Sequence, residues 1–441
     1  MTELPPGWAP ARVGEIAELT DGPFGSNLKT AHYTESGPRV VRLQNIGHGV
    51  FRGEPAHIAE DHYKRLIKHA VGHSDIVVAS LGEDAPRACL VPHWLGPAIV
   101  KADCIRLRTR DGIDPSFLMW MLNSPLVRAQ AAPSIKGVGR PRLGLGGIRR
   151  LSVPIPPPHE QRRIVAAIEE QFSRLDAAEE SLAAAKAKLR ALRTESLASA
   201  TSGYALVDLG SVVLDLRYGT SIKCTREPVG PPVLRIPNVQ RGRVDLGDLK
   251  FATDPRVDLS AFAVEPGDLL FVRTNGSRDL IGRLAAVEHA DGFAFASYLI
   301  RARPDLSRLE PKYAVYALST PSQRAAIEAK AATTAGQYNL NLAALRSLSI
   351  SLPPLADQRR IVANLERRLS LLDALSVAIE SAHARSAALR RSILERAFTG
   401  KLVPQDPSDE PASVLLERIA AERAASAQPR RAGRSARAAK A

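Results

Sequence analysis

The chain has 441 residues, enough for two to four domains, and 45% of them are hydrophobic, so it can bury sizeable cores. Lysine and arginine outnumber aspartate and glutamate by 60 to 46, and the resulting net charge of +14 makes an anionic partner plausible. The opening MTELPPGWAP lacks a basic start and an apolar core, and no apolar run approaches the roughly 20 residues that span a bilayer, so we expect neither a signal peptide nor a membrane helix.

The three cysteines predict the compartment. Cys89, Cys104 and Cys224 are far apart and odd in number, so they suggest neither a disulfide framework nor a metal pair, and we expect a cytoplasmic protein. The segment after Glu422 contains arginines and one lysine without any acid, so we expect the last part of the 404–441 tail to be disordered.

The first 150 residues predict a mixed α/β domain. Residues 40–43 and 75–78 are apolar runs typical of strands, and residues 115–125 are bounded by two prolines that predict a short helix. A long helix should follow within 151–203, because three prolines end at Pro158 and neither proline nor glycine occurs from His159 to Ser202.

The second half repeats the first. An offset of 197 residues aligns 139–203 with 336–400 without a gap, and 27 of these 65 positions are identical. Shorter matches extend the repeat upstream, among them FGSNLK (24–29) with YGTSIK (218–223) and VVRLQNI (40–46) with VLRIPNV (233–239). We therefore expect a second mixed domain over 204–347 and a second long helix over 348–403.

Seven-residue spacing predicts that the two helices pair. Leu175, Leu182 and Leu189 form one set of positions, which we expect to interleave with a second set at Ala178, Ala185 and Leu192. The second helix has the corresponding sets Leu365, Leu372 and Ile379, and Leu375, Ala382 and Leu389. Each helix has about 40 residues and a length of about 60 Å. We expect an antiparallel coiled coil; the alternative is that each helix packs on its own domain.

One motif occurs at the start of both helices. Two prolines precede Gln-Arg-Arg-Ile-Val at 161–165 and again at 358–362, and the run AFTGKLVPQDPSDEPASVLLERI follows at 397–419. This pattern resembles the specificity subunits of Type I restriction–modification systems, and the resemblance covers about Trp8 to Ala421. The first copy departs from the pattern at RPRLGLG (140–146), where the second has QYNLNLA (337–343).

The resemblance implies a fold and a division of labour. It implies an α+β protein with an internal pseudo-twofold repeat, in which two target recognition domains are separated by the paired helices. Each domain would read one half of a bipartite, asymmetric double-stranded DNA target, and the helices would fix the spacing between the halves. Two methyltransferase subunits would dock on the helices, and translocating restriction subunits would complete the complex. S-adenosylmethionine, ATP and magnesium would bind only those partners.

Base-reading side chains are most often Arg, Lys, Asn, Gln, Ser or Thr on loops or element ends. The candidates for DNA binding in the first domain are Ser26, Asn27, Lys29, Arg42, Gln44, Asn45 and Arg87. Those in the second are Thr220, Ser221, Lys223, Arg235, Asn238, Arg273, Thr274, Asn275, Ser277 and Arg278. The segment RTNGSR (273–278) is the strongest candidate, although it could also be a solvated hairpin turn. Residues shared between the halves should contact phosphates, and unshared ones should read bases.

Four arginines near the helix starts are candidates for partner binding: Arg162, Arg163, Arg359 and Arg360. They could instead form a solvated face, ion-paired with Glu169 and Glu366.

Catalytic motifs are missing from the sequence. It contains no Asn/Asp-Pro-Pro-aromatic motif, no Gly-rich cofactor loop and no Walker motif, so we expect neither catalytic residues nor a bound cofactor. A nuclease or methylase fragment is the alternative, because Asp305, Glu310 and Lys312 could bind Mg²⁺. However, Glu310 aligns with Asp114 at a predicted helix start, where a carboxylate before proline is ordinary. A coiled-coil interaction protein without a DNA function is a third reading.

Four histidines lie close in sequence: His57, His62, His69 and His73. His69 and His73 could share a helix face and bind a metal, but we expect surface or phosphate-facing histidines and no metal site.

Overall fold

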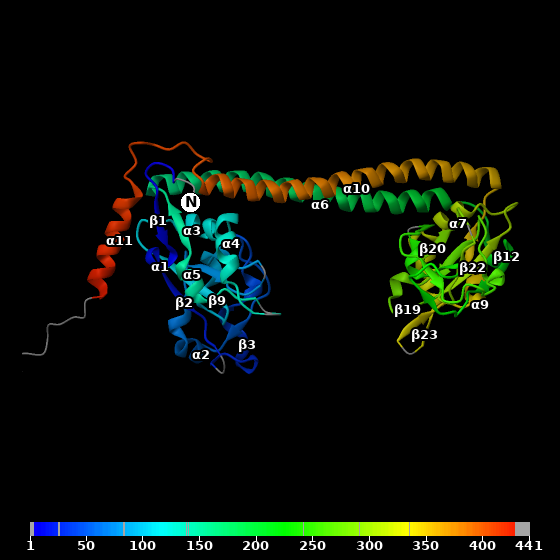
Figure 1. Cartoon of the computed structure of the whole chain (residues 1–441), viewed down its shortest axis with the longest axis horizontal. Coiled ribbons are helices and arrows are strands. Elements are labelled where there is room, and N and C mark those ends of the chain that lie inside the picture. Colours follow the sequence, from blue (N-terminus) through cyan, green and yellow to red (C-terminus); the bar gives the residue numbers. More distant parts are fainter. Residues whose placement is uncertain are drawn as a thin grey trace, which may run out of the picture. The chain divides into compact units, whose positions relative to one another are not determined.

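The computed structural model describes residues 4–24, 27–82, 84–137, 139, 141–240, 242–290, 292–334 and 336–427. The chain forms two compact units. Unit 1 comprises Met1–Glu180 with His383–Ala441, and unit 2 comprises Ser181–Ala382. Each unit contains one β-rich domain and a part of both long helices (Figure 1). Ser26 and the predicted disordered part of the tail from residue 428 onward lie outside the described residues.

Unit 1 is built on two four-stranded sheets and a two-stranded one. The first sheet has the order β2(Ala17–Asp21), β9(Cys104–Thr109), β6(Ile76–Ala79), β7(Arg87–Leu90). The second has the order β4(His57–Ile58), β3(Tyr33–Val41), β8(Ala98–Val100), β5(Ala70–Val71). The pair is β1(Ala9–Arg12) with β10(Ser152–Ile155). The helices are α1(Val13–Ile16), α2(Glu60–Arg65), α3(Pro115–Leu122), α4(Pro125–Ala131), α5(Leu145–Arg150) and α11(Ala412–Ala427).

Unit 2 has a larger sheet at its centre. Its order is β12(Val213–Tyr218), β22(Leu299–Pro304), β18(Leu269–Val272), β20(Leu284–Ala286), β16(Gly242–Val244), β15(Val239–Gln240). A four-stranded sheet contains β13(Cys224–Thr225), β17(Lys250–Ala252), β14(Pro232–Leu234) and β21(Ala294–Phe295). A three-stranded sheet contains β19(Thr274–Asn275), β24(Gln337–Asn339) and β23(Ala332–Thr334), and β11(Leu206–Asp208) pairs with β25(Ser349–Ser351). The helices are α7(Pro311–Leu318), α8(Pro321–Lys330) and α9(Leu342–Arg346).

The two units share one core plan, which confirms the predicted α+β internal repeat. Strands β2, β9, β6 and β7 of unit 1 correspond in order to β12, β22, β18 and β20 of unit 2. The predicted short helix is α3, which starts at Pro115 because Asp114 caps it by accepting a hydrogen bond from Phe117 N at 3.0 Å. The equivalent α7 likewise begins with a proline, Pro311.

The long helices are α6(Pro158–Thr201) and α10(Leu355–Phe398), each of 44 residues. They run antiparallel within each unit. In unit 1, Glu179 of α6 accepts a hydrogen bond from Ser386 at 2.6 Å, and the earlier Asp176 pairs with the later Arg390. In unit 2, Lys186 pairs with Glu380 and the later Arg193 pairs with the earlier Asp373. The predicted antiparallel coiled coil is confirmed.

Half of the predicted seam is wrong. The leucine set at Leu175, Leu182 and Leu189 is half-buried, as expected. Most of the second set lies outside the seam, because Leu375 is 52% exposed and Leu389 is 51% exposed, whereas its alanines Ala185 and Ala382 are half-buried. A leucine every seven residues permits a second seam position either three or four residues further on. The sequence favoured the position three residues after each leucine, where apolar side chains such as Ala178 occur. The structure uses the position four residues after it, where charged side chains such as Glu179 pair across the helices.

One buried glutamine joins the start of each long helix to the β-rich domain of the same unit. In unit 2, Gln358 accepts a hydrogen bond from Glu310 N at 2.8 Å and donates to the carbonyls of Arg308 and Pro353 at 2.7 and 2.8 Å. In unit 1, Gln161 accepts from Asp114 N at 2.8 Å and donates to the Pro156 carbonyl at 3.1 Å. Both side chains are buried, so these helix-start glutamines join each helix to the loop before α3 or α7.

None of the helices in the described part of the chain combines the length and the apolar character needed to cross a bilayer.

Removing a helix-start glutamine should destabilise its unit. Gln358→Ala and Gln161→Ala leave buried backbone groups without partners, which costs about 1–3 kcal/mol. Thermal unfolding followed by circular dichroism measures the loss. Arg367→Ala, an exposed side chain on the same α10, is the control and should change stability by no more than about 0.5 kcal/mol. Wild-type unfolding midpoints in both glutamine variants would contradict this role.

Candidate nucleic-acid interface

Five of the candidate DNA-binding residues of unit 2 gather at one end of its central sheet. Strands β12 and β18 end there, at Tyr218 and Val272, and the antiparallel β22 begins there, at Leu299. Gly219 is needed at this place, because a Cβ atom would lie 2.3 Å from the carbonyl oxygens of Phe295 and Ala296. We call this surface the polar edge of unit 2; it comprises Thr220, Ser221, Arg273, Thr274, Asn275, Ser297 and Tyr298.

Backbone hydrogen bonds hold the polar edge of unit 2 together. Thr220 N donates to Phe295 O at 2.9 Å, and Ser297 N donates to Thr220 O at 2.7 Å. Arg273 N donates to Tyr298 O at 2.8 Å. Three segments that are distant in sequence thus present their polar side chains on one surface.

Arg273 is partly held within the chain. Its guanidinium lies 4.2 Å from the centre of the Tyr218 ring, and it donates to the Ser297 carbonyl at 3.3 Å. Arg278 is more exposed and lies 3.2 Å from Glu328. Asn275 accepts a hydrogen bond from Ser277 N at 2.8 Å, so RTNGSR is a short strand followed by a tight turn.

Two candidate pairs occupy matching turns. Asn45 accepts from Arg42 N at 2.9 Å and donates to the Arg52 carbonyl at 2.9 Å. Asn238 accepts from Arg235 N at 2.8 Å and donates to the Asp245 carbonyl at 2.7 Å. Both asparagines are buried, so their amides stabilise the turns.

Both arginines of these turns point back into their own domains. Arg42 donates to the Glu54 carbonyl at 2.8 Å, and Arg235 pairs with Asp248 at 3.0 Å. DNA binding by either turn stays a prediction.

The remaining candidates of both domains are placed as follows. Asn27, Lys29 and Gln44 of unit 1 are exposed, as are Ser221, Lys223 and Ser277 of unit 2. Arg87 is held by three partners: it donates to the carbonyls of Ile46 and Leu43 at 2.7 and 3.2 Å and to Asp84 at 2.7 Å. Unit 1 has the same edge architecture, since a Cβ on Gly22 would lie 2.1 Å from the Lys101 carbonyl.

Ion pairs on a buried aspartate, at the end of each central sheet opposite the edge, were missed by sequence reasoning. Arg108 binds Asp75 through two hydrogen bonds of 2.8 Å, and the equivalent Arg303 binds Asp268 at 2.9 and 3.0 Å. The signal was present, because SDIVVAS (74–80) and GDLLFVR (267–273) are matching segments of the repeat. These pairs fix the strands that carry the edges.

The possible nuclease residues have separate partners. Asp305 accepts from the Ser307 hydroxyl at 2.6 Å in a turn, whereas Lys312 lies 2.9 Å from Glu366 and 3.2 Å from Glu288.

Burial lowers the pKa of His69, whose Nδ1 lies 2.6 Å from the Asp21 carbonyl. Over the residues that the structure describes, no three His, Cys, Asp or Glu side chains are grouped to hold a metal.

The candidate partner-binding arginines mostly have intrachain neighbours. Arg163 pairs with Asp409 at 2.7 Å and Arg360 with Asp357 at 2.8 Å. Arg162 lies 2.9 Å from His159 Nδ1, and Arg359 lies 3.9 Å from Glu310. Glu366, which the sequence suggested as an alternative ion-pair partner of these arginines, pairs instead with Lys312.

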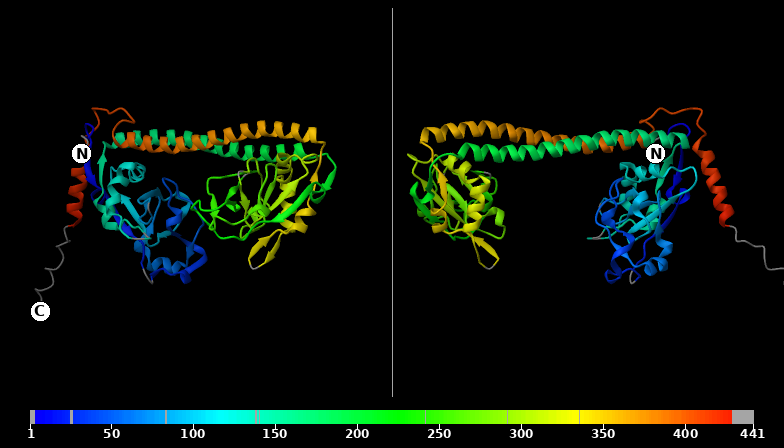
Figure 2. Two further views of the ribbon diagram at one scale, coloured as in Figure 1. Left: turned by 45° about the vertical axis from the view of Figure 1, so that its right-hand side comes forward. Right: turned by 180° about the vertical axis from the view of Figure 1, so that it is seen from behind.

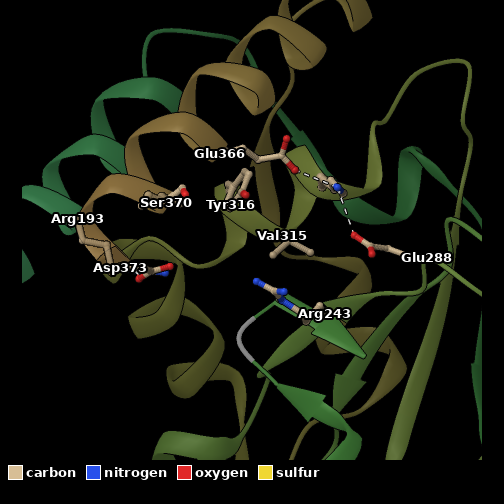
Figure 3. Close-up of a pocket in the computed structure, with 11 residues that line it drawn as sticks. Arg193, Arg243, Glu288, Val315, Tyr316, Glu366, Ser370 and Asp373 are labelled. Atoms are coloured by element: carbon tan, nitrogen blue, oxygen red, sulfur yellow. Dashed lines mark hydrogen bonds and ion pairs between the residues drawn. The ribbon is translucent and has the colours of Figure 1, made fainter. Parts of the chain in front are cut away.

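A pocket of about 380 Å³ lies between the helices and the domain of unit 2 (Figure 3). Its wall contains Tyr316, Leu369 and the ion pairs of Lys312 and Arg193. In unit 1, the larger Trp120 and Phe172 hold the equivalent positions, with ring centres 5.0 Å apart. Smaller side chains at these two positions therefore open the pocket in unit 2.

No family model matches the chain. The Type I restriction enzyme EcoKI specificity subunit of Escherichia coli (strain K12) is 28% identical over 96% of this chain and 97% of its own length. The StySPI specificity subunit of Salmonella potsdam is 25% identical over the same shares.

Two solved structures share the fold. One, described as the structural basis of complex assembly and conformational transition of the type I R-M system, has a TM-score of 0.72, with 23% identity over 91% of this chain and all of that one. The HsdS subunit from Thermoanaerobacter tengcongensis has a TM-score of 0.56, with 23% identity over 90% of this chain and 98% of its own. With its duplicated domains and its antiparallel helices, the chain is similar from end to end to Type I restriction enzyme specificity subunits.

Proposed function

We propose that this chain is the DNA-recognition subunit of a Type I restriction–modification complex, in which each β-rich domain reads one half of a bipartite, asymmetric target. One observation carries the proposal: the two domains keep the same buried framework while the polar side chains at their sheet edges differ. Arg106 and Arg301 are equivalent and buried, whereas Ser80 and Leu81 of unit 1 stand where unit 2 has Arg273 and Thr274. A duplicated reader with two different targets needs this combination.

The chain's role in the complex is non-catalytic. The sequence lacks methyltransferase and motor motifs, and Asp305 and Lys312 are committed to different partners. Methyl transfer and cleavage would therefore belong to methyltransferase and restriction subunits, which would bind S-adenosylmethionine, ATP and magnesium. The three free cysteines agree with action in the cytoplasm.

The helices supply both a spacer and a docking surface. A helical pair fixes distance because its length is set by residue count. The leucines left outside the seam have a use here: in unit 2, Leu371, Ala374, Leu375 and Ala378 of α10 are exposed at the spacing of one helix face. We assign this face to a helix of a methyltransferase subunit, since an apolar stripe on a helix is normally covered by another helix. Arg359 and Arg360 near the start of α10, and Arg162 and Arg163 near the start of α6 in unit 1, would add polar contacts to methyltransferase subunits.

Methylation should require both proteins. We expect the purified chain alone to transfer no methyl group, and a mixture with its methyltransferase subunit to methylate adenines within one bipartite sequence. Sequencing that detects N6-methyladenine in a plasmid library identifies the target, and the methyltransferase alone is the control. Turnover of S-adenosylmethionine by the isolated chain would disprove the non-catalytic role.

Exchanging one domain should change one half of the target. Residues 204–347 are replaced by the equivalent segment of a related specificity subunit, and the methylated sequence is mapped as above. We expect a new half-site on one side and the original half-site on the other, because each domain has its own core and its own edge. Altered bases in both half-sites would show that the domains do not read independently.

Charge on the apolar face should block assembly without unfolding the chain. Leu371→Glu with Leu375→Glu should weaken binding of the methyltransferase subunit at least about tenfold, because docking would bury unpaired charges. The thermal unfolding midpoint should hardly change, since both leucines are exposed. Ser381→Glu, which adds charge to another exposed position of α10, is the control. Unfolding of the double variant would instead place these leucines in the seam.

A further inference from the structure

Unit 2 carries a β-hairpin that projects beyond its polar edge. Strands β23 and β24 form it, and Figures 1 and 2 show it extending from the body of the domain, away from the helices of the same unit. Strand β24 continues into the edge by pairing with β19, with Thr274 opposite Asn339. Leu340 N donates to the Arg273 carbonyl at 2.9 Å, and the Leu340 side chain is buried. The hairpin is thus anchored to the surface that carries the candidate DNA-binding residues.

We propose that this hairpin enters the major groove of DNA and that Gln337, the first residue of β24, reads the edge of a base pair. The inference rests on the proposed function and adds a specificity-determining residue to it. Two strands lie about 4.8 Å apart, and the major groove is about 12 Å wide, so a two-stranded ribbon with its side chains fits it.

The side chain of Gln337 is available for a ligand. It is exposed, and within the described residues its side-chain amide takes part in no hydrogen bond; the Asn339 amide donates to the main-chain carbonyl of Gln337. Asn45 and Asn238, by contrast, bond to their own turns. A glutamine amide can donate to N7 and accept from N6 of adenine at once, which distinguishes that base from the others.

Asn339 has a positioning role. It accepts a hydrogen bond from the Thr274 hydroxyl at 2.7 Å, so it ties the hairpin to RTNGSR. The hairpin and the segment 273–278 are therefore parts of one surface. Gln337 lies two residues before Asn339, whose position this hydrogen bond fixes.

The equivalent place in unit 1 supports the assignment. Lys136 and Arg142 pair there, with Lys136 N donating to Arg142 O at 3.1 Å and the reverse bond at 2.8 Å. Leu143 N donates to the Ser80 carbonyl at 2.8 Å, as Leu340 does to Arg273. Gly139 and Gly336, at matching positions of the repeat, have φ values of +77° and +76°, so the left-handed glycine is also shared.

The side chains of the two hairpins differ. Unit 1 has the cationic Lys136 and Arg142, of which Arg142 pairs with Asp103 at 2.9 Å, whereas unit 2 has Gln337 and Asn339. The Gln337 amide, which is unpaired within the described residues, suits adenine. Simple drift of a loop would not keep the anchoring leucine and the left-handed glycine at matching positions. Kept anchoring positions with different polar side chains are what two domains that read different half-sites require.

The test uses the full chain with its methyltransferase subunit and a DNA library in which each target position is randomised. Gln337→Ala should reduce discrimination at one or two adjacent positions of a single half-site by roughly 5- to 150-fold. The other half-site should be methylated as by the wild type. Ser307→Ala, in an exposed turn at the end of the central sheet opposite the polar edge, is the matched control and should leave every position unchanged.

Each outcome decides the question. Gln337→Ala with wild-type preferences at all positions would overturn the inference, and so would equal weakening for every sequence, which indicates a phosphate contact. An unchanged thermal unfolding midpoint rules out loss of the fold as the cause. The proposed function fails separately if the wild-type chain directs no sequence-specific methylation.

Discussion

The hydrogen bonds of Gln161 and Gln358 are the constraint on which the rest of the architecture depends. Each glutamine satisfies a backbone N–H of the loop before α3 or α7 and carbonyls near the start of its own helix. Because the groups are buried, any movement of helix against domain would leave them without partners. The start of a long helix and a recognition domain therefore behave as one body in each unit, and a reader attached to a spacer needs that rigidity.

The helix pair has charged residues at part of its seam, which reduces apolar burial but selects one register of the two helices. Its second seam position holds Phe172 and Leu369 near the domains, and charged residues such as Lys186 and Arg193 further along. Such pairs add little stability when exposed, but they disfavour other registers because a shift would oppose like charges. They also leave leucines on the outer face, where a partner helix can cover them. One sequence thus specifies both an intramolecular register and an intermolecular surface.

The two domains separate framework from recognition. Ion pairs on a buried aspartate, Asp75 with Arg108 and Asp268 with Arg303, hold the same strands in both. Close backbone approaches at Gly22 and Gly219 bring the strand ends together. Substitution at the edges then changes the displayed chemistry with little cost to the core, so one fold can serve two targets.

The sequence by itself determined the duplication, the two long helices and the resemblance to specificity subunits, because each leaves a linear signal: an offset of 197, a run without proline or glycine, and the repeated Gln-Arg-Arg-Ile-Val. It also placed RTNGSR near the candidate interface. It did not determine the seam, since leucines seven residues apart allow two registers and only the facing charges choose between them. It nominated Asn45 and Asn238 as DNA-binding residues by their type, but only the tertiary structure revealed that both amides are buried in turns. Gln337 was passed over because its importance depends on strand pairing with a segment more than 60 positions away. Composition and spacing identify which groups are present, whereas the long-range contacts decide which of them remain free to meet another molecule.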